Sequence, residues 1–190
     1  MRGFVPCIKT QYMKHLLFLL LLAGMCFSSA AQKATAATLR SVLLDELKTT
    51  HNKKEWFVPV NTAVEGLTAE QAMWKDSSGN HSVGQLVNHL AFWNAQQLAK
   101  FKGEKPGAFN GNNDETFDNK LDKNSWAASV KKLDDILTQL EQLISKADEA
   151  KLQSWAATIA NISTHNAYHT GQIIFVRKLH GNWDPEKGVK

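Results

Sequence analysis

Cysteine is nearly missing from this sequence. Its two cysteines, Cys7 and Cys26, both lie near the N-terminus, and none follows. If the first 31 residues are removed, as argued below, the mature chain has no thiol. That absence excludes a disulfide framework, thiolate catalysis, cysteine-ligated zinc and covalent haem attachment. It also suits a protein exported to an oxidising compartment.

An excess of one charge is also missing once the N-terminal segment is set aside. The full sequence has 22 Lys+Arg and 18 Asp+Glu. Residues 1–31 hold three of the basic residues and no acid, so 19 basic and 18 acidic residues remain. No basic block is left that could follow a phosphate backbone, and we expect no nucleic-acid binding.

The sequence also lacks a hydrophobic run long enough to span a membrane comfortably. The apolar run at 16–25 is well short of the ~20 residues of a transmembrane helix. It lies between a basic start at Lys14 and the small residues 29–31, which is the layout of a secretory signal peptide. We predict a signal peptide over 1–31 and an exported protein, periplasmic or secreted, that starts at Gln32 and has no stable membrane insertion.

Two alternatives remain open within the leader. Met13 begins a complete signal peptide by itself, so it is an alternative start to Met1. Cys26 raises the alternative of a lipid anchor. However, Met25 precedes it where a small residue is usual, and Ala23 stands where a branched aliphatic residue is usual. The match therefore favours cleavage over lipidation.

Alternation of polar and apolar residues, the mark of half-buried strands, is absent too, and helical spacing prevails. Pro59 interrupts the first helix and either kinks it or opens a new segment that runs to Gly66. Ser82 and Gln85 form a capping box at the start of the second helix. The helices that we predict run from about Thr38, over 82–102, through 130–144, and from about Ser154 to Leu179. The fold expected for 32–190 is all-α, a single four-helix bundle.

Two histidines in the last predicted helix have the spacing of a metal pincer. His165 and His169 are four residues apart, which places them about 40° apart on one helix face. The same face carries Ile162 and Val176, so it points inward, where neutral imidazoles need partners. The pair fits a metal site and equally fits a polar core network. Asn166 replaces the glutamate of H-E-x-x-H, which excludes a zincin-type protease.

The other histidines of the mature chain differ in their promise as ligands. His89 lies in the middle of the second helix and can complete a three-histidine site with one open position. His51 is a weaker competitor, and His81 reads as a surface or turn residue. His180 reads as a helix-end residue stabilised by the helix dipole.

Three segments resemble the DinB/YfiT-like superfamily. HSVGQLVNHLAFW at 81–93 is similar to its second-helix signature, and GLTAEQA at 66–72 to the turn before it. THNAYHTGQI at 164–173 resembles the H-x-x-x-H-x-G-Q of its last helix. The resemblance extends over nearly all of 35–185. It implies a four-helix bundle, a homodimer, and a divalent metal held by three histidines, here His89, His165 and His169.

The metal itself is not fixed by these ligands. Imidazole suits zinc, nickel, copper and iron alike, and we expect zinc or nickel. An ion on three imidazoles keeps an open position at which it can activate water or a substrate thiolate. Members of the superfamily include thiol-dependent isomerases and S-transferases, so the resemblance implies an activity of that kind. Export argues against that activity, because low-molecular-weight thiol cofactors belong mainly to the cytoplasm.

We carry three hypotheses for the function. The first is a metal-dependent hydrolase or transferase, acting on a small-molecule substrate. The alternatives are a non-catalytic periplasmic bundle that binds metal or ligand, and an interaction protein whose histidines merely pack.

No acid lies within a turn of a proposed ligand, so the catalytic residues stay open. Gln172 is a candidate either to support the histidines or to line a pocket. Trp56, Trp93 and Tyr168 line a pocket or pack in the core, and core packing is favoured.

Overall fold

The computed structural model describes residues 36–117 and 122–189, with the side chains of 123 and 124 left aside. The signal peptide predicted for 1–31 and the mature start at Gln32 lie outside this range. Within it there is no strand, and no helix combines the length and apolar character needed to cross a membrane.

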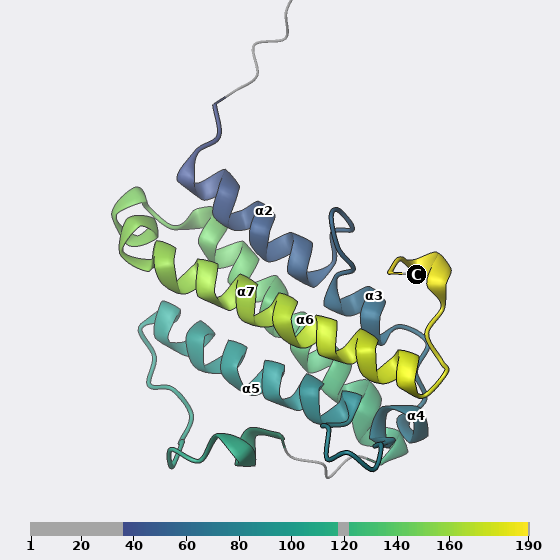
Figure 1. The fold of residues 1–190 in the computed structure, drawn as a ribbon. Coiled ribbons are helices and arrows are strands. Elements are labelled where there is room, and N and C mark those ends of the chain that lie inside the picture. The colour runs from purple at the N-terminus through teal and green to yellow at the C-terminus, as the bar shows by residue number, and fades with distance from the viewer. Residues whose placement is uncertain (1–35, 118–121, 190) are drawn as a thin grey trace, which may run out of the picture. The chain divides into compact units, whose positions relative to one another are not determined.

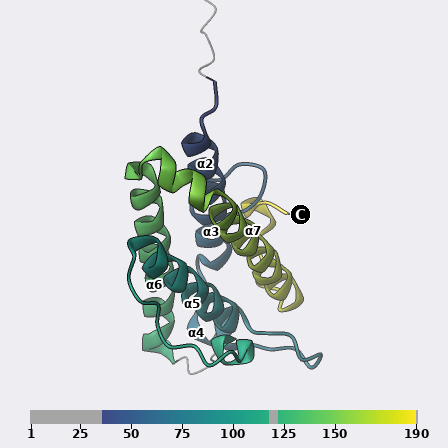
Figure 2. The ribbon, with the colours of Figure 1, turned by 90° about the vertical axis from the view of Figure 1, so that its left-hand side faces the viewer.

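Four long helices make up the described domain (Figure 1). They are α2 (Leu39–His51), α5 (Val83–Lys102), α6 (Lys123–Lys146) and α7 (Glu149–Leu179). Helix α7 packs against α2 and α5, and α6 packs against the same two helices from the other side (Figure 2). This arrangement confirms the predicted all-α four-helix bundle.

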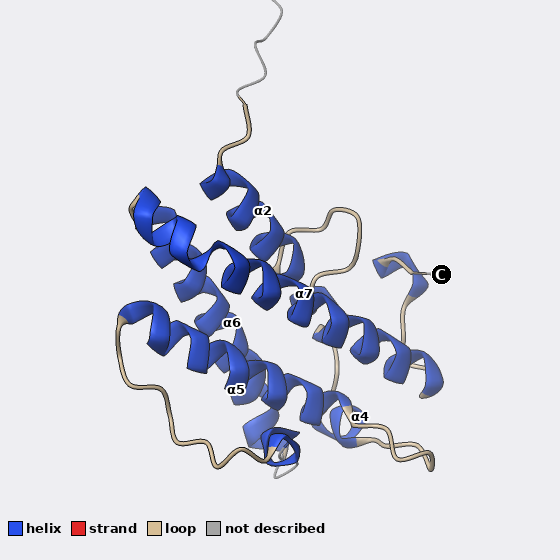
Figure 3. Ribbon diagram, turned by 60° about the vertical axis from the view of Figure 1, so that its left-hand side comes forward, coloured by secondary structure: helices blue, strands red, loops and turns tan. Residues whose placement is uncertain are grey.

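Short helical segments fill the connections (Figure 3). Between α2 and α5 lie α3 (Val60–Val64) and α4 (Ala69–Met73); the 3₁₀ turn η1 (Asn113–Phe117) follows α5, and η2 (Pro185–Lys187) follows α7. Pro59 is the N-cap of α3, so it opens a new segment and does not kink α2.

The start of α5 is fixed locally, as the sequence predicts. The Ser82 hydroxyl accepts from the Gln85 backbone N–H at 3.2 Å, and the Gln85 side chain accepts from the Ser82 N–H at 3.0 Å. Helix α5 ends at Gly103, whose φ of 79° is the left-handed conformation that glycine adopts without strain. The helix that carries His89 thus has both ends set by local chemistry.

The predicted start of α7 was wrong by five residues. The helix begins at Glu149, not near Ser154. The side chain of Asp148 accepts from the Lys151 N–H at 2.7 Å and caps it. In the first turn only Leu152, which is fully buried, belongs to an apolar pattern. The capping residue Asp148 is therefore the feature of the sequence that marks the start of the helix.

An arginine contact closes the corner between α6 and α7. The Arg40 guanidinium on α2 donates to the carbonyl oxygens of Ile144, Ser145 and Ala147 at 3.1, 3.1 and 2.7 Å. Carbonyls at a helix C-terminus have no partner within the helix, so a cation there satisfies them.

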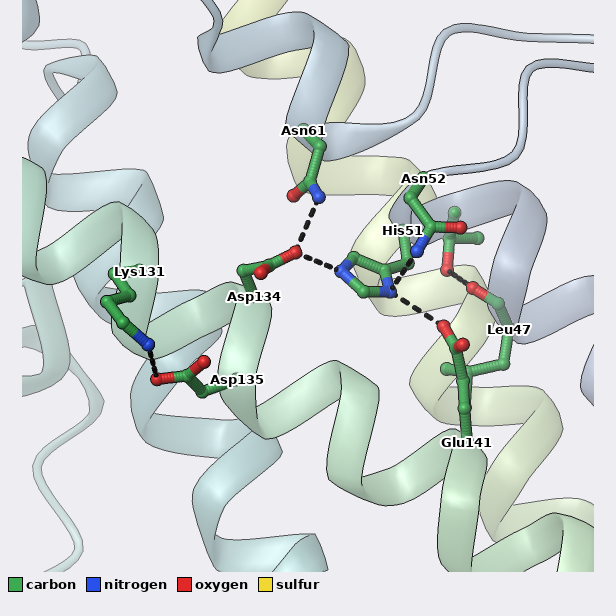
Figure 4. A network of polar contacts seen from close by, with 9 residues as sticks. Leu47, His51, Asn52, Asn61, Lys131, Asp134, Asp135 and Glu141 are labelled. Atoms are coloured by element: carbon green, nitrogen blue, oxygen red, sulfur yellow. Dashed lines mark hydrogen bonds and ion pairs between the residues drawn. The ribbon is translucent and has the colours of Figure 1, made fainter.

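The buried His51 connects α2 to α6 (Figure 4). Its Nδ1 lies 2.6 Å from Glu141 Oε1 and its Nε2 lies 2.8 Å from Asp134 Oδ1. Asn61 of α3 donates to the same Asp134 oxygen at 2.6 Å. Burial opposes charge on the ring, yet the hydrogen bonds and charges of the two carboxylates outweigh it and raise the pKa of His51. A carboxylate at each nitrogen makes this ring an imidazolium, not a metal ligand.

This ion pair makes stability pH-dependent. Because the folded-state pKa of His51 is raised above 6.5, its stabilisation is complete below pH 6.5 and is lost as pH rises through the folded-state pKa. We predict that His51→Gln lowers the free energy of unfolding by about 2–4 kcal/mol at pH 6. This loss is smaller than that for breaking a fully buried ion pair, because the side chain of Asp134 is partly exposed.

Urea denaturation of both proteins between pH 6 and 9 measures the effect, with His180→Gln as the matched control. The loss caused by His51→Gln should shrink toward pH 9, and that of the control should not change. A loss that grows with pH would contradict the charged assignment.

Candidate metal centre

Helix α7 presents His165 and His169 on one face, as their spacing predicts. Their ring centroids are 4.5 Å apart. Ile162 and Val176 on that face are buried, so the face does point inward. Gln172 supports the pair: its Oε1 lies 2.6 Å from His169 Nδ1. A bonded Nδ1 leaves Nε2 of His169 for another partner.

Helix α5 brings the third ring. His89 is buried, and its Nε2 lies 3.2 Å from His165 Nε2. Its ring centroid is 4.6 Å from that of His169. One ligand nitrogen of each ring lies within 4.8 Å of the other two. The structure therefore brings together the three residues that the sequence nominates, and the group could hold a metal ion.

The spacing of the nitrogens suits an ion between them. Two imidazole nitrogens bound to one tetrahedral zinc at about 2.0–2.1 Å lie roughly 3.3–3.4 Å apart. The Nε2 atoms of His89 and His165 are already at 3.2 Å. Closing the site on an ion needs little movement of these two rings.

Electrostatics keep the three rings neutral. Burial, reinforced by the neighbouring His169 and His165, lowers the pKa of His89 to about 3. Burial and His169 lower the pKa of His165 to about 4. Burial also lowers the pKa of His169, although its hydrogen bond to Gln172 opposes the shift. Neutral imidazole is the form that binds metal.

The turn η1 covers His89 from outside the bundle. Thr116 Oγ1 lies 2.6 Å from His89 Nδ1. The Phe117 ring stacks on the His89 ring with centroids 3.9 Å apart and planes 8° apart. His81 stacks on Phe117 at 3.8 Å, so it is half-buried in a three-ring stack rather than a plain surface residue. Sequence reasoning missed Thr116 and Phe117, because no helical period links them to His89.

The remaining histidines lie outside this group. Both nitrogens of His51 are engaged by carboxylates. His180 is the C-cap of α7, the helix-end position that the sequence indicates, and its Nδ1 lies 2.8 Å from the Asn182 amide.

Asn166, at the position of the zincin glutamate, has a structural role. It is 1% exposed, and its Oδ1 accepts from Asn94 Nδ2 at 2.8 Å. The same Asn94 nitrogen donates to the Leu90 carbonyl at 2.8 Å. This amide pair joins α5 to α7 beside the histidines.

A cavity of about 520 Å³ opens at the three rings. Its other lining residues are Trp93, Asn94, Gln97, Asn113, Phe117, Thr158, Asn161 and Ile162. Among these described lining residues none is acidic and none is Lys or Arg. The lining therefore offers neutral hydrogen-bonding groups and aromatic surface beside the three imidazoles.

Of the three aromatic residues considered from sequence, only Trp93 reaches this cavity. Its Nε1 donates to Asn113 Oδ1 at 3.2 Å. Core packing, the favoured prediction, was wrong for Trp56, which is 97% exposed, and for Tyr168, which is 64% exposed. Tyr168 instead places its ring against His169 at 5.0 Å between centroids.

The contribution of the Asn94–Asn166 amide pair, which joins α5 to α7 beside the histidines, can be tested through stability. We predict that Asn94→Ala or Asn166→Ala costs about 1–3 kcal/mol of unfolding free energy, because each removes the hydrogen bond between the two buried amides. The double variant should cost less than the two single losses added together. Denaturation of the four proteins measures this coupling. Strict additivity would show that the two amides act independently.

Comparison with known families agrees with the site. A family model described as the DinB superfamily matches residues 59–173, more than half of the chain and all three histidines. No curated protein and no solved structure matches the chain. The helical bundle and the match together show that the chain belongs to the DinB superfamily, which includes metal-binding members.

Proposed function

We propose that this protein is an exported metal-dependent hydrolase or transferase that acts on a small molecule at an ion held by His89, His165 and His169. One observation carries the proposal: three neutral imidazoles converge on the wall of a cavity of about 520 Å³. That volume is in the range of small-molecule sites. Export rests on the leader at 1–31 and is a separate part of the proposal.

The residues present suit such an ion. A divalent ion, zinc or nickel, would supply Lewis acidity that polarises a carbonyl or lowers the pKa of a coordinated group. His165 and His169 would hold it from one rigid helix, and His89 would complete the set from the facing helix. Gln172 accepts from His169 Nδ1 and leaves Nε2 free for the ion.

The rest of the cavity would position the substrate. Amide and hydroxyl groups of Gln97, Asn161 and Thr158 offer neutral hydrogen-bond partners. Trp93 and Phe117 supply aromatic surface. No carboxylate is among the described lining residues, so the lining does not supply a carboxylate as general base.

Metal content and thermal stability test the ligand set. We predict one divalent ion per chain in the parent protein and loss of that ion in His89→Ala, His165→Ala and His169→Ala. In metal-containing buffer each variant should also lose the linked stabilisation, about 2.7 kcal/mol when the ion is at 100 times its dissociation constant.

His180→Ala is the matched control and should keep the ion. Chelator should remove most of the difference in melting temperature between parent and variants. A His89→Ala protein that keeps full occupancy, while His51→Ala loses it, would refute the ligand set.

An activity screen separates an enzyme from a metal-binding bundle without catalysis. Esters, amides and thiol conjugates are tested with and without chelator. We predict turnover that chelator abolishes and that added zinc or nickel restores. Metal binding with no turnover across these classes would favour the non-catalytic alternative.

A further inference from the structure

We infer that Thr116 is a positioning residue of the metal centre: its hydroxyl holds His89 in the Nδ1–H tautomer, so that the lone pair of Nε2 faces the other two imidazoles. The purpose of this arrangement rests on the proposed function. The tautomer itself is a property of the chain without any ion, so it can be measured independently.

The directions of two hydrogen bonds fix the tautomer. Thr116 Oγ1 lies 2.6 Å from the backbone carbonyl oxygen of Asn113. A carbonyl only accepts, so the single hydroxyl hydrogen is used there. Thr116 Oγ1 can then only accept from His89 Nδ1, which lies 2.6 Å away on its other side. The hydrogen of the neutral ring is therefore on Nδ1, and Nε2 carries the lone pair.

That lone pair lies where an ion would need it. His89 Nε2 is the atom 3.2 Å from His165 Nε2. With the lone pair on Nε2, His89 accepts at this contact and could bind an ion through the same atom without first losing a hydrogen. Thr116 thus accepts from His89 Nδ1 as Gln172 accepts from His169 Nδ1, but Thr116 lies on a separate segment of the chain.

The same turn also fixes the plane of the ring. One face of the Phe117 ring stacks on His89 with planes 8° apart, and His81 covers the other face of Phe117. Gln85 Nε2 donates to the Phe117 carbonyl at 3.0 Å, which ties the turn to the first turn of α5. Thr116 is 5% exposed, so water competes little for its hydroxyl.

The turn further connects the ligand to the cavity wall. Asn113, whose carbonyl accepts from Thr116, lines the cavity and accepts from Trp93 Nε1 through its side chain. A substrate that contacts Asn113 therefore touches the element that holds His89.

Long-range ¹H–¹⁵N NMR of the metal-free protein tests the tautomer directly. We expect His89 in the Nδ1–H form in the parent and in Thr116→Ser, which keeps the hydroxyl. Thr116→Val keeps the shape but has no acceptor, and should give a mixture or the Nε2–H form. An Nε2–H tautomer of His89 in the parent protein would overturn the inference, whether or not the valine variant folds.

Zinc affinity measured by competition with a chelating dye tests the consequence. Thr116→Val should bind zinc about 10–100-fold more weakly, the usual cost of losing an outer partner of a ligand. Thr116→Ser should restore the parent affinity. Thr50→Val is the matched control, because Thr50 is a buried threonine of α2 whose hydroxyl also donates to a backbone carbonyl, that of Leu47 at 2.8 Å.

The control should keep the parent affinity even if it melts at a lower temperature. Equal zinc affinity of Thr116→Val and the parent would overturn the positioning role. A parent protein that binds no zinc would refute the proposed function, and the tautomer measured in the metal-free protein would still decide whether Thr116 orients His89.

Discussion

Three imidazole rings buried against one another cannot all carry charge, and the centre of this protein is organised around that constraint. Burial and the neighbouring rings lower the pKa values of His89, His165 and His169 together. Neutral rings with inward nitrogens still need partners, because a buried polar group without one is costly. A divalent ion would satisfy all three at once.

His51 shows the opposite solution to the same problem. It is fully buried in the same bundle, but carboxylates of α6 face both of its nitrogens and raise its pKa. One buried histidine is thus kept charged to join helices, and three are kept neutral. The difference lies in the neighbours, Asp134 and Glu141 in one case and other imidazoles in the other. Burial alone does not tell a structural histidine from a candidate ligand.

The parts of the site that the sequence predicts are those set by local chemistry. The i,i+4 spacing of His165 and His169 and the capping box of Ser82 and Gln85 both act within one turn of helix, and the structure has both. His89 was nominated as their partner from its position in the middle of the second helix, and the family resemblance names the same residue. The polar first turn of α7 hid its start from a reading based on apolar spacing.

The parts that the sequence could not predict depend on contacts between distant segments. Thr116 reaches His89 across 27 positions, and Asn94 reaches Asn166 across 72. No period or short motif encodes such pairs. Trp56 was misjudged for a related reason: aromatic residues are usually buried, but this one lies on a connection between helices, where it is 97% exposed.

A crystal structure of the protein with added zinc, with anomalous diffraction recorded at the zinc edge, tests the account most directly. The account predicts one strong anomalous peak about 2.0–2.1 Å from a nitrogen of each of His89, His165 and His169. A peak held by other residues, or none at this group while zinc is bound elsewhere, would contradict it.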